Sequence, residues 1–292
     1  MKSVIVLGAT SMLGRETVRQ LLVEGIEVIR AGRQPDSDIV VDLGSDNAPE
    51  FRRARRADAL IHCASAFGGD SPEGIRDNLR VNIGGCVQTL EIARQSGAKK
   101  IIYAGSVSSD PMLESGLIGS YGFSKAEAER ILNWGITRDG GRFCSLRFTQ
   151  LWDTEGACCA HQPWFGRIVA YASRGQTIKM PAANGRRNFM HVSDAAQLLI
   201  RAAGGTLEGI HSVSHPVDID LAEFAQVAYR VFGRGGSVVI DPAKTPFRNV
   251  NFPREEGVFK ALGYQPRISP EQGLVLIRDA GTDDRFGPMD VQ

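Results

Sequence analysis

Short apolar, β-branched runs alternate with longer segments of helical periodicity along the first half of the chain. Residues 2–7 form the first apolar run, and a helical pattern follows from Leu13 to Leu22 and closes at Gly25. Further runs lie at residues 27–31, 40–43, 58–65 and 100–106, and helices are predicted over about 77–96 and over 221–232. Apolar runs that alternate with helices are typical of a parallel sheet covered on both faces. The pattern predicts an α/β protein with a doubly wound parallel sheet.

A glycine-containing turn, from Gly8 to Gly14, joins the first strand to the first helix. Backbone N–H groups and the positive end of the helix dipole face the space above such a turn, where a pyrophosphate fits. A plain tight turn is the alternative. The second strand ends in Gly32-Arg33, where dinucleotide folds place an acidic residue for ribose hydroxyls or an arginine for a 2′-phosphate. This pair favours NADP over NAD, with a solvated surface arginine as the alternative.

Tyr121 and Lys125 stand four residues apart in a predicted helix, so their side chains lie one turn apart on the same face. A nearby ammonium favours the phenolate and lowers the pKa of the phenol. The pair is therefore a candidate acid–base group, although Tyr and Lys recur at this spacing on ordinary helix faces. Ser106 ends an apolar strand, at the edge where open parallel sheets bind ligands, with Ser108 and Ser109 as competitors. His62 is interpreted as a packed core histidine.

Composition narrows the class of protein further. The 292 residues include 34 Lys and Arg against 33 Asp and Glu, and this balance indicates neither a nucleic-acid nor a membrane partner. The N-terminal apolar run is too short for a signal peptide, and no segment approaches the ~20 apolar residues of a membrane crossing. We therefore expect a cytoplasmic protein. Five cysteines without paired metal spacing suit a reducing compartment, and Cys158-Cys159-Ala160-His161 lacks a second ligand pair, so no metal site is expected.

Several motifs follow one another along almost the whole chain. They are the Gly8 to Gly14 turn, Asp42-Leu43, His62-Cys63-Ala64, Asn82, Ser106, Tyr121-x-x-x-Lys125, Leu146-Arg147, Arg187 to Asp194, and Leu262 to Leu274. In this order they resemble the extended short-chain dehydrogenase/reductase superfamily. The branch that they resemble comprises NAD(P)-dependent nucleotide-sugar epimerases, dehydratases and ketoreductases.

The resemblance implies a Rossmann fold with a smaller, discontinuous C-terminal substrate domain. The NAD(P)-binding domain is expected over residues 1–150, with about 187–214 partly returning to it, and the substrate domain over 151–186 and 215–280. Residues 281–292 are expected to form a flexible tail. Relatives commonly form homodimers through a helix bundle that includes the tyrosine helix, so a homodimer is the expected assembly if the chain associates.

The resemblance also implies roles for individual residues. In the superfamily the tyrosine is the general acid/base, the lysine holds the nicotinamide ribose and tunes the tyrosine, and the serine binds the reacting oxygen. These roles fall on Tyr121, Lys125 and Ser106, and Asn82 matches a supporting asparagine, with a structural role as the alternative. The implied substrate-binding residues are Ser106, Ser108, Tyr121, Gln150 and Arg187. The implied cofactor-binding residues are Gly8, Thr10, Ser11, Met12, Leu13, Gly14, Arg33, Asp42, Leu43, Cys63, Ala64, Ser65, Lys125 and Phe148.

Three departures from the superfamily pattern bear on function. Ser11 replaces the middle glycine of G-x-x-G-x-x-G and adds a Cβ near the pyrophosphate, so we expect a shifted loop. Gln150 takes the place of a substrate-binding asparagine, so the substrate group is expected to differ from a standard nucleotide sugar. Val107-Ser108 stands where 4,6-dehydratases carry an acidic pair, which disfavours dehydration.

These observations predict an NADP(H)-dependent oxidoreductase that reduces a keto group, on a nucleotide-linked sugar or a related small molecule. An NAD-dependent nucleotide-sugar epimerase is one alternative, because epimerisation uses the same residues with a tightly held NAD. A non-catalytic NADP-sensing regulator is the other, although such relatives generally lose the tyrosine or the lysine. The substrate is expected to be selected by loops over residues 66–76, 107–120 and 150–188.

Overall fold

The chain folds into two compact units. The structure, a computed structural model, describes residues 1–52, 56–113, 119–182, 185–247 and 250–289. The first unit comprises Met1–Phe148, Ala195–Val213 and Pro253–Gln265, and the second comprises Thr149–Asp194, Ser214–Phe252 and Pro266–Gln292. Both units are therefore built from separate stretches of sequence.

An eight-stranded sheet forms the centre of the first unit, in the order β12-β7-β6-β5-β1-β2-β3-β4. Its strands are β1 (Ser3–Leu7), β2 (Glu27–Gly32), β3 (Ile39–Val40), β4 (Glu50–Phe51), β5 (Ala59–His62), β6 (Lys100–Ser106), β7 (Arg142–Phe148) and β12 (Gly209–Val213). Neighbouring strands are parallel except β3 and β4. This arrangement confirms the predicted doubly wound parallel sheet, and the carboxyl ends of β1, β2, β5 and β6 meet at one edge.

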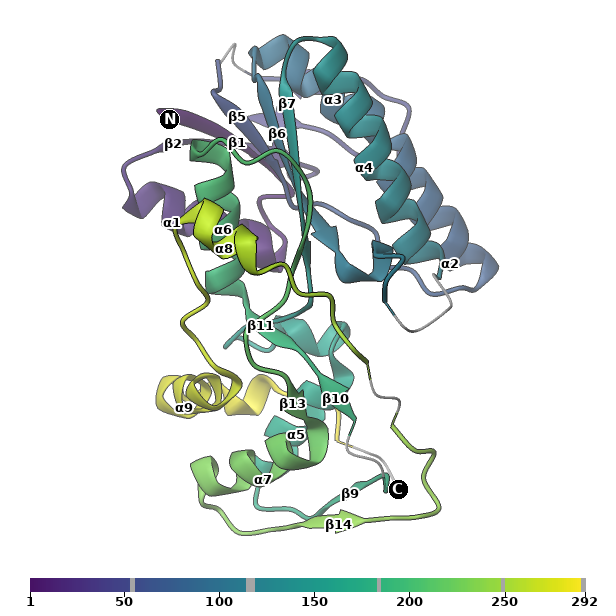
Figure 1. Cartoon of the computed structure of the whole chain (residues 1–292), viewed down its shortest axis with the longest axis vertical. Coiled ribbons are helices and arrows are strands. Elements are labelled where there is room, and N and C mark those ends of the chain that lie inside the picture. The colour runs from purple at the N-terminus through teal and green to yellow at the C-terminus, as the bar shows by residue number, and fades with distance from the viewer. Residues whose placement is uncertain (53–55, 114–118, 183–184, 248–249, 290–292) are drawn as a thin grey trace. The chain divides into compact units, whose positions relative to one another are not determined.

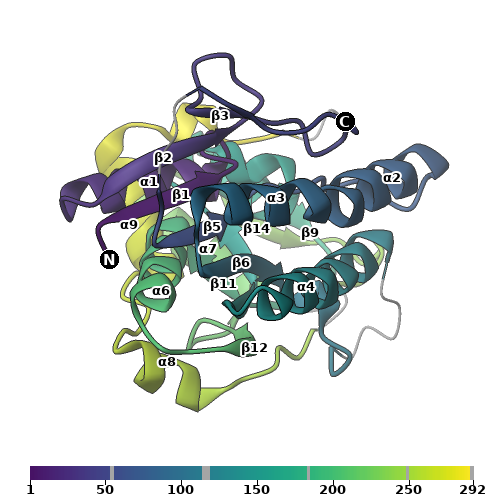
Figure 2. The same cartoon turned by 90° about the horizontal axis from the view of Figure 1, so that it is seen from above.

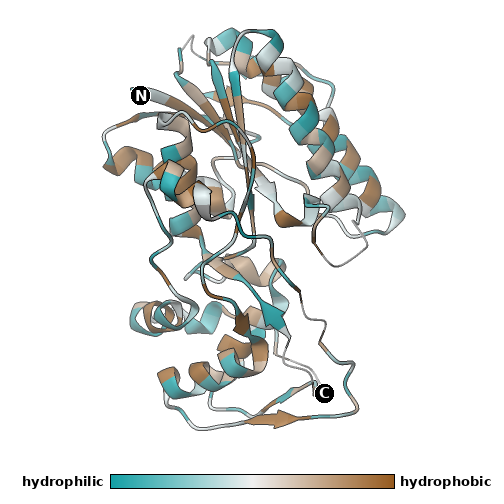
Figure 3. Ribbon diagram, viewed as in Figure 1, coloured by the Kyte–Doolittle hydropathy of each residue, from teal (hydrophilic) through white to brown (hydrophobic). Residues whose placement is uncertain are grey.

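Helices cover both faces of this sheet, with α3 and α4 on one face and α1 and α6 on the other (Figure 1 and Figure 2). The helical segments of the unit are α1 (Met12–Val23), α2 (Pro72–Asp77), η1 (Asn78–Gly84), α3 (Cys86–Ser96), η2 (Val107–Ser109), α4 (Ser120–Arg138), α6 (Val192–Gly204, from residue 195 onward) and α8 (Glu256–Leu262). Hydrophobic stretches lie along the strands, and the helices carry both hydrophilic and hydrophobic residues (Figure 3). All of β1 is buried, as expected for a strand covered on both sides.

Three predicted elements differ from the structure, and one of them, the strand predicted over 58–65, is limited to Ala59–His62. The strand predicted over 40–43 ends at Val40, because Asp42 turns the backbone: its side chain accepts a hydrogen bond from the Gly44 N–H (3.0 Å), and its carbonyl accepts one from the Ser45 N–H (3.0 Å). The single helix predicted over 77–96 is three segments, α2, the π-helix η1 and α3. The strand predicted over 100–106 and the helix predicted over 221–232 are confirmed as β6 and α7.

The second unit is organised around buried aromatic rings. Its elements are β8 (Gln150–Trp152), η3 (Ala157–Ala160), α5 (Pro163–Ser173), β9 (Ile178–Met180), β10 (Arg186–Arg187), β11 (Phe189–His191), β13 (Ile219–Asp220), α7 (Leu221–Phe232), β14 (Val238–Ile240), α9 (Pro270–Ala280) and η4 (Asp283–Arg285). Phe165 stacks on Trp152 and on Phe224, with ring centroids 5.0 Å apart in each pair. These rings join α5, α7 and β8 into one core.

The sequence predicts a flexible tail over 281–292, of which residues 281–289 are described and make contacts within the second unit. Thr282 is buried, and its hydroxyl donates to the Thr154 carbonyl. Phe286 is also buried and lies against Phe165, while Arg285 pairs with Glu155. A buried aromatic side chain anchors this stretch, which charge and glycine content alone did not indicate. Among the described residues, no helix has the length and apolar character required to span a bilayer.

Candidate active site

The turn between β1 and α1 brings the backbone close to the end of β5. Gly8 has a φ of +82°, and a Cβ at this position would lie 2.6 Å from the Ala64 nitrogen. A Cβ on Gly14 would overlap the Gly8 carbonyl oxygen. Both positions therefore require glycine, and the turn leaves space for an anion above the N-terminus of α1.

Ser11 occupies the position of the middle glycine in this turn. Its backbone is extended, with a φ of −67° and a ψ of 162°, so the position does not need a glycine. Its hydroxyl caps α1 by accepting a hydrogen bond from the Gly14 N–H at 3.0 Å, and it lies 3.4 Å from the Cys63 carbonyl. The serine thus stabilises the turn that the glycine would otherwise form.

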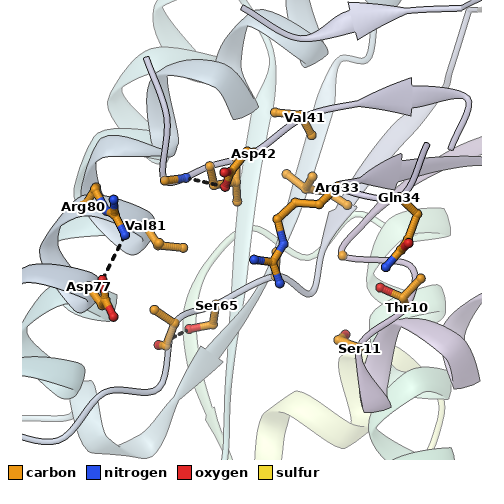
Figure 4. Close-up of a pocket in the computed structure, with 17 residues that line it drawn as sticks. Thr10, Ser11, Arg33, Gln34, Val41, Asp42, Ser65, Asp77, Arg80 and Val81 are labelled. Carbon is orange, nitrogen blue, oxygen red and sulfur yellow. Dashed lines mark hydrogen bonds and ion pairs between the residues drawn. The ribbon is translucent and has the colours of Figure 1, made fainter. Parts of the chain in front are cut away.

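A cavity of about 520 Å³ lies above this turn, at the carboxyl edge of the sheet (Figure 4). Eight of the predicted cofactor-binding residues line it: Gly8, Thr10, Ser11, Arg33, Asp42, Leu43, Ala64 and Ser65. Other residues that line the cavity carry no motif that predicts them, including Gln34, Asp77, Arg80 and Val81. The glycine cradle and the helix N-terminus fit the adenosine diphosphate part of a dinucleotide.

Arg33 projects from the end of β2 into this cavity (Figure 4). Gly32, which precedes it, carries no carboxylate. The other arginine of the lining, Arg80, is paired with Asp77 at 3.0 Å. Within the described part of the chain, the Arg33 guanidinium makes no ion pair, so its charge is available to a bound anion.

Other predicted cofactor contacts lie outside this cavity. Leu13 and Phe148 are buried, with 7% and 2% of their surface exposed, and they pack in the core of the unit. Met12 and Cys63 are partly buried, and neither lines the cavity. Leu13 and Phe148 lie among the buried residues of α1 and β7, so they pack in the core and do not face the cavity.

Tyr121 lies in the first turn of α4, within reach of two serine hydroxyls. Burial raises the pKa of Tyr121, and side-chain hydrogen bonds with Ser106 and Ser65 oppose this effect. Ser106 ends β6, and its hydroxyl accepts a hydrogen bond from the Ser108 N–H at 3.2 Å. The phenol is therefore protonated at neutral pH and placed to donate its proton to an oxygen beside Ser106. The bond with Ser65 does not follow from the motifs, which imply only a cofactor contact for Ser65.

The Lys125 ammonium binds a backbone carbonyl and lies over an aromatic ring. Its Nζ donates to the Ala104 carbonyl at 2.7 Å and lies 4.0 Å from the ring centroid of Tyr103. Burial lowers the pKa of Lys125 to about 8, and the Glu129 carboxylate opposes this effect. The predicted lowering of the Tyr121 pKa by this ammonium is wrong: burial raises that pKa, and the opposing groups are serine hydroxyls.

His62 is a packed core residue, as predicted. It is 4% exposed and makes an edge contact with Tyr103, with ring centroids 5.1 Å apart. Burial, together with the charge of Lys125, lowers the pKa of His62 to about 3. The imidazole is therefore uncharged at neutral pH.

Asn82 is buried behind the site and connects two of its segments. Its Oδ1 accepts from the Ala66 N–H at 2.8 Å, and its Nδ2 donates to the Ser124 hydroxyl at 3.0 Å. The side chain therefore joins the loop after β5 to helix α4. These hydrogen bonds fit a structural role for Asn82 beside the site.

Gln150 and Arg187, the predicted substrate contacts, both belong to the second unit. Gln150 donates to the Gln162 side chain at 2.7 Å. Arg187 donates to the Arg186 carbonyl at 2.8 Å, and partial burial lowers the pKa of Arg187. Residues 114–118 and 183–184 of the predicted substrate loops lie outside the described residues.

The Lys125 pKa leads to a testable dependence of stability on pH. Because burial favours the neutral amine, the folded protein releases this proton near pH 8, whereas the unfolded chain keeps it up to the ordinary value of 10.5. Stability should therefore rise by about 1–3 kcal/mol as pH increases through this interval. Urea unfolding of the wild type and of Lys125→Met, from about pH 7 to pH 10, measures the difference.

The wild type should gain stability relative to Lys125→Met across that interval. Lys179→Met removes an exposed lysine and should follow the wild-type curve. Parallel curves for the wild type and Lys125→Met would contradict the lowered Lys125 pKa.

Known proteins resemble this chain in sequence and in fold. A UDP-glucose 4-epimerase of Lacticaseibacillus casei is 26% identical over 172 residues, which span 50% of this chain and only half the length of that epimerase. A GDP-L-fucose synthase of Sinorhizobium fredii is 22% identical over 301 aligned residues, covering 94% of this chain and 93% of the relative. A UDP-N-acetylglucosamine 4-epimerase from Bacillus cereus has a similar fold, with a TM-score of 0.76, 19% identity, and coverage of 100% of this chain and 99% of that structure.

A family model covers most of the first unit. The model of the NAD dependent epimerase/dehydratase family matches residues 4–211, which include the glycine turn, Arg33, Ser106, Tyr121 and Lys125. The match confirms the superfamily and the class of NAD(P)-dependent enzyme that the motifs predicted. This chain belongs to the NAD dependent epimerase/dehydratase family.

Proposed function

We propose that the chain is an NADP(H)-dependent oxidoreductase that reduces a keto group, on a nucleotide-linked sugar or a related small molecule. The observation that carries the proposal is the position of the Tyr121 side chain beside the Ser106 and Ser65 hydroxyls, at the carboxyl edge of the sheet. The same edge carries the glycine cradle and the Arg33 cavity.

In this proposal Tyr121, Ser106 and Lys125 each have a separate function in the reaction. A nicotinamide cofactor, when bound, supplies the hydride for the carbonyl carbon. Tyr121 donates its proton to the carbonyl oxygen as negative charge develops there, and the Ser106 hydroxyl orients that oxygen. Lys125, whose Nζ donates to the Ala104 carbonyl, would bind the nicotinamide ribose.

Arg33 supports the choice of NADP(H). A 2′-phosphate carries negative charge that a guanidinium binds through charge-assisted hydrogen bonds. The preceding residue, Gly32, supplies no carboxylate to bind the ribose hydroxyls of NAD(H). The cavity therefore suits the phosphorylated dinucleotide better than the unphosphorylated one.

The decisive experiment is oxidation of reduced cofactor by the purified chain. NADPH and NADH are each mixed with a panel of nucleotide-linked keto-sugars and small ketones, and absorbance of the reduced nicotinamide is followed. Consumption of NADPH with one member of the panel supports the reductase. Binding of NADPH without any turnover would indicate a cofactor-sensing regulator instead.

Substitution of Arg33 tests the cofactor preference separately. Arg33→Ala should weaken NADPH binding about 10–100-fold, the loss expected for hydrogen bonds to a charged group, and leave NADH binding nearly unchanged. Fluorescence titration of each cofactor measures the two affinities. Arg52→Ala, which removes an exposed arginine next to β4, is the matched control and should change neither. Equal losses for NADPH and NADH would contradict the role of Arg33.

An NAD-dependent nucleotide-sugar epimerase is a second candidate. It is favoured by the relatives, which include the Lacticaseibacillus casei UDP-glucose 4-epimerase and a UDP-glucose 4-epimerase of Thermus thermophilus solved in complex with NAD. The same tyrosine and serine would serve, with the proton removed in one half-reaction and returned in the other. NAD retained through purification, with interconversion of two nucleotide sugars and no net cofactor use, would favour the epimerase over the reductase.

A further inference from the structure

Two buried asparagines lie four residues apart on the π-helix η1, behind the proposed catalytic tyrosine. Asn78 is 0% exposed and Asn82 is 6% exposed. Short π-helical segments are uncommon, and they occur frequently at functional sites. Asn82 matches a motif of the superfamily, whereas Asn78 was not among the predicted site residues.

Both asparagines bind the loop that follows β5. Asn78 accepts from the Gly68 N–H at 2.8 Å and donates to the Gly68 carbonyl at 2.9 Å. Asn82 accepts from the Ala66 N–H at 2.8 Å and donates to the Ala66 carbonyl at 3.1 Å. Each amide thus makes a two-way hydrogen bond with one residue, and the two residues flank Phe67.

The same two amides also bind helix α4, on either side of Tyr121. The Asn78 Nδ2 donates to the Ser120 hydroxyl at 2.9 Å, and the Asn82 Nδ2 donates to the Ser124 hydroxyl at 3.0 Å. Ser124 in turn donates to the Tyr121 carbonyl at 2.9 Å. The first turn of α4 is therefore fixed to η1 immediately before and shortly after the tyrosine.

Loop and helix meet at the tyrosine itself. The Phe67 ring lies 4.3 Å from the Tyr121 ring, centroid to centroid. Ser65, whose hydroxyl lies 3.1 Å from the Asn82 Oδ1, also hydrogen-bonds with the Tyr121 side chain. Asp70 adds a further tie, because its carboxylate accepts from the Ser120 N–H at 2.7 Å where Gly119 offers no capping side chain.

We propose that Asn78 is a positioning residue for Tyr121: together with Asn82 it clamps the 65–68 loop to the first turn of α4, and this clamp fixes the tyrosine hydroxyl between Ser65 and Ser106. The inference rests on the proposed catalytic role of Tyr121. It requires no contact between Asn78 and substrate or cofactor.

Asn78→Leu, which keeps the side-chain size and removes all three hydrogen bonds, tests the clamp. Because a displacement of the proton donor by about 1 Å can cost on the order of 10²-fold in rate, kcat for NADPH oxidation should fall by about that factor. NADPH affinity should remain near the wild-type value, since Asn78 does not line the cofactor cavity. The Ser65 hydrogen bond lowers the Tyr121 pKa. Its loss in the variant should therefore raise that pKa and move the alkaline limb of the kcat profile to higher pH.

A measurement that needs no turnover separates this inference from the proposed function. Tyrosinate absorbance is titrated in the wild type and in Asn78→Leu, each compared with the same protein carrying Tyr121→Phe, so that the difference reports Tyr121 alone. The titration midpoint of Tyr121 should rise in Asn78→Leu. This result would support the clamp even if no substrate of the wild type were found.

Two further variants distinguish a specific effect on Tyr121 from a general loss of folding. Ser120→Ala removes only the link from Asn78 to α4 and should give a smaller shift in the same direction. Gln88→Leu removes a buried amide that binds the carbonyls of residues 42, 45 and 47, and it should leave the Tyr121 midpoint in place. An unchanged midpoint in both Asn78→Leu and Ser120→Ala, or an equal shift in Gln88→Leu, would overturn the proposal.

Discussion

Replacing Tyr121 by Phe is expected to lower kcat about 10³-fold, within the range found when a general acid is removed. The phenol is partly buried and protonated at neutral pH, and it is the acidic group that hydrogen-bonds with Ser106. Phe keeps the ring against Phe67, so the loop and helix should hold their places. The variant should therefore bind NADPH with nearly the wild-type affinity, measured by fluorescence titration alongside steady-state kinetics.

Tyr229→Phe provides a matched control. This tyrosine lies in α7 of the second unit, and its hydroxyl donates to the Gln176 carbonyl, so the same single oxygen is lost outside the proposed site. Its kcat should stay close to that of the wild type. Turnover by Tyr121→Phe at the rate of Tyr229→Phe would remove Tyr121 from the chemistry.

The order of elements in the first unit could be predicted from the sequence because its signals are local. Uninterrupted apolar runs mark strands that are buried on both faces, and β6 agrees with its predicted bounds. The turn at Gly8 is equally local, since the positive φ and the approach of Ala64 both demand glycine. Arg33 could be placed in the cavity because it directly follows the end of a strand.

The parts that the sequence did not predict depend on side chains distant in the chain. Periodicity shows that Tyr121 and Lys125 share a helix face, but not that Nζ binds the Ala104 carbonyl. The contribution of Ser65 to the tyrosine, and that of Asn78 to the loop, depend on how η1 packs against α4. Such hydrogen bonds leave no periodic signal, because any polar residue at the right place in the fold would satisfy them.

A buried ion pair beneath the site also joins side chains that are distant in the sequence. Glu129, one turn after Lys125 on α4, is 0% exposed. Its carboxylate accepts from the Arg147 Nη2 at 2.6 Å and from the Ser145 hydroxyl at 2.7 Å. A Cβ on Gly105 would lie 2.9 Å from the Glu129 carboxylate, so the glycine of β6 makes room for the pair. Glu129 therefore connects α4 to β7 and also raises the Lys125 pKa against the effect of burial.

Glu129→Gln should reduce the free energy of unfolding by about 3 kcal/mol. Removing one partner of a buried pair leaves the other charge uncompensated, which costs about 3–5 kcal/mol. The lower end is expected here, because Asp110 lies 3.8 Å from Arg147 and remains in place. Urea unfolding followed by circular dichroism at neutral pH measures the loss.

The control lies on the same helix. Glu127 pairs with Arg130 at 3.1 Å on the exposed side of α4, and Glu127→Gln should cost no more than about 0.5 kcal/mol. The two variants make the same chemical change, so they differ only in the burial and partners of the carboxylate. Because Glu129 also supports the charge of Lys125, its loss should move the Lys125 titration below pH 8, whereas Glu127→Gln should leave it there. Equal stability of the two variants would show that the Arg147 charge finds sufficient compensation in Asp110 and water.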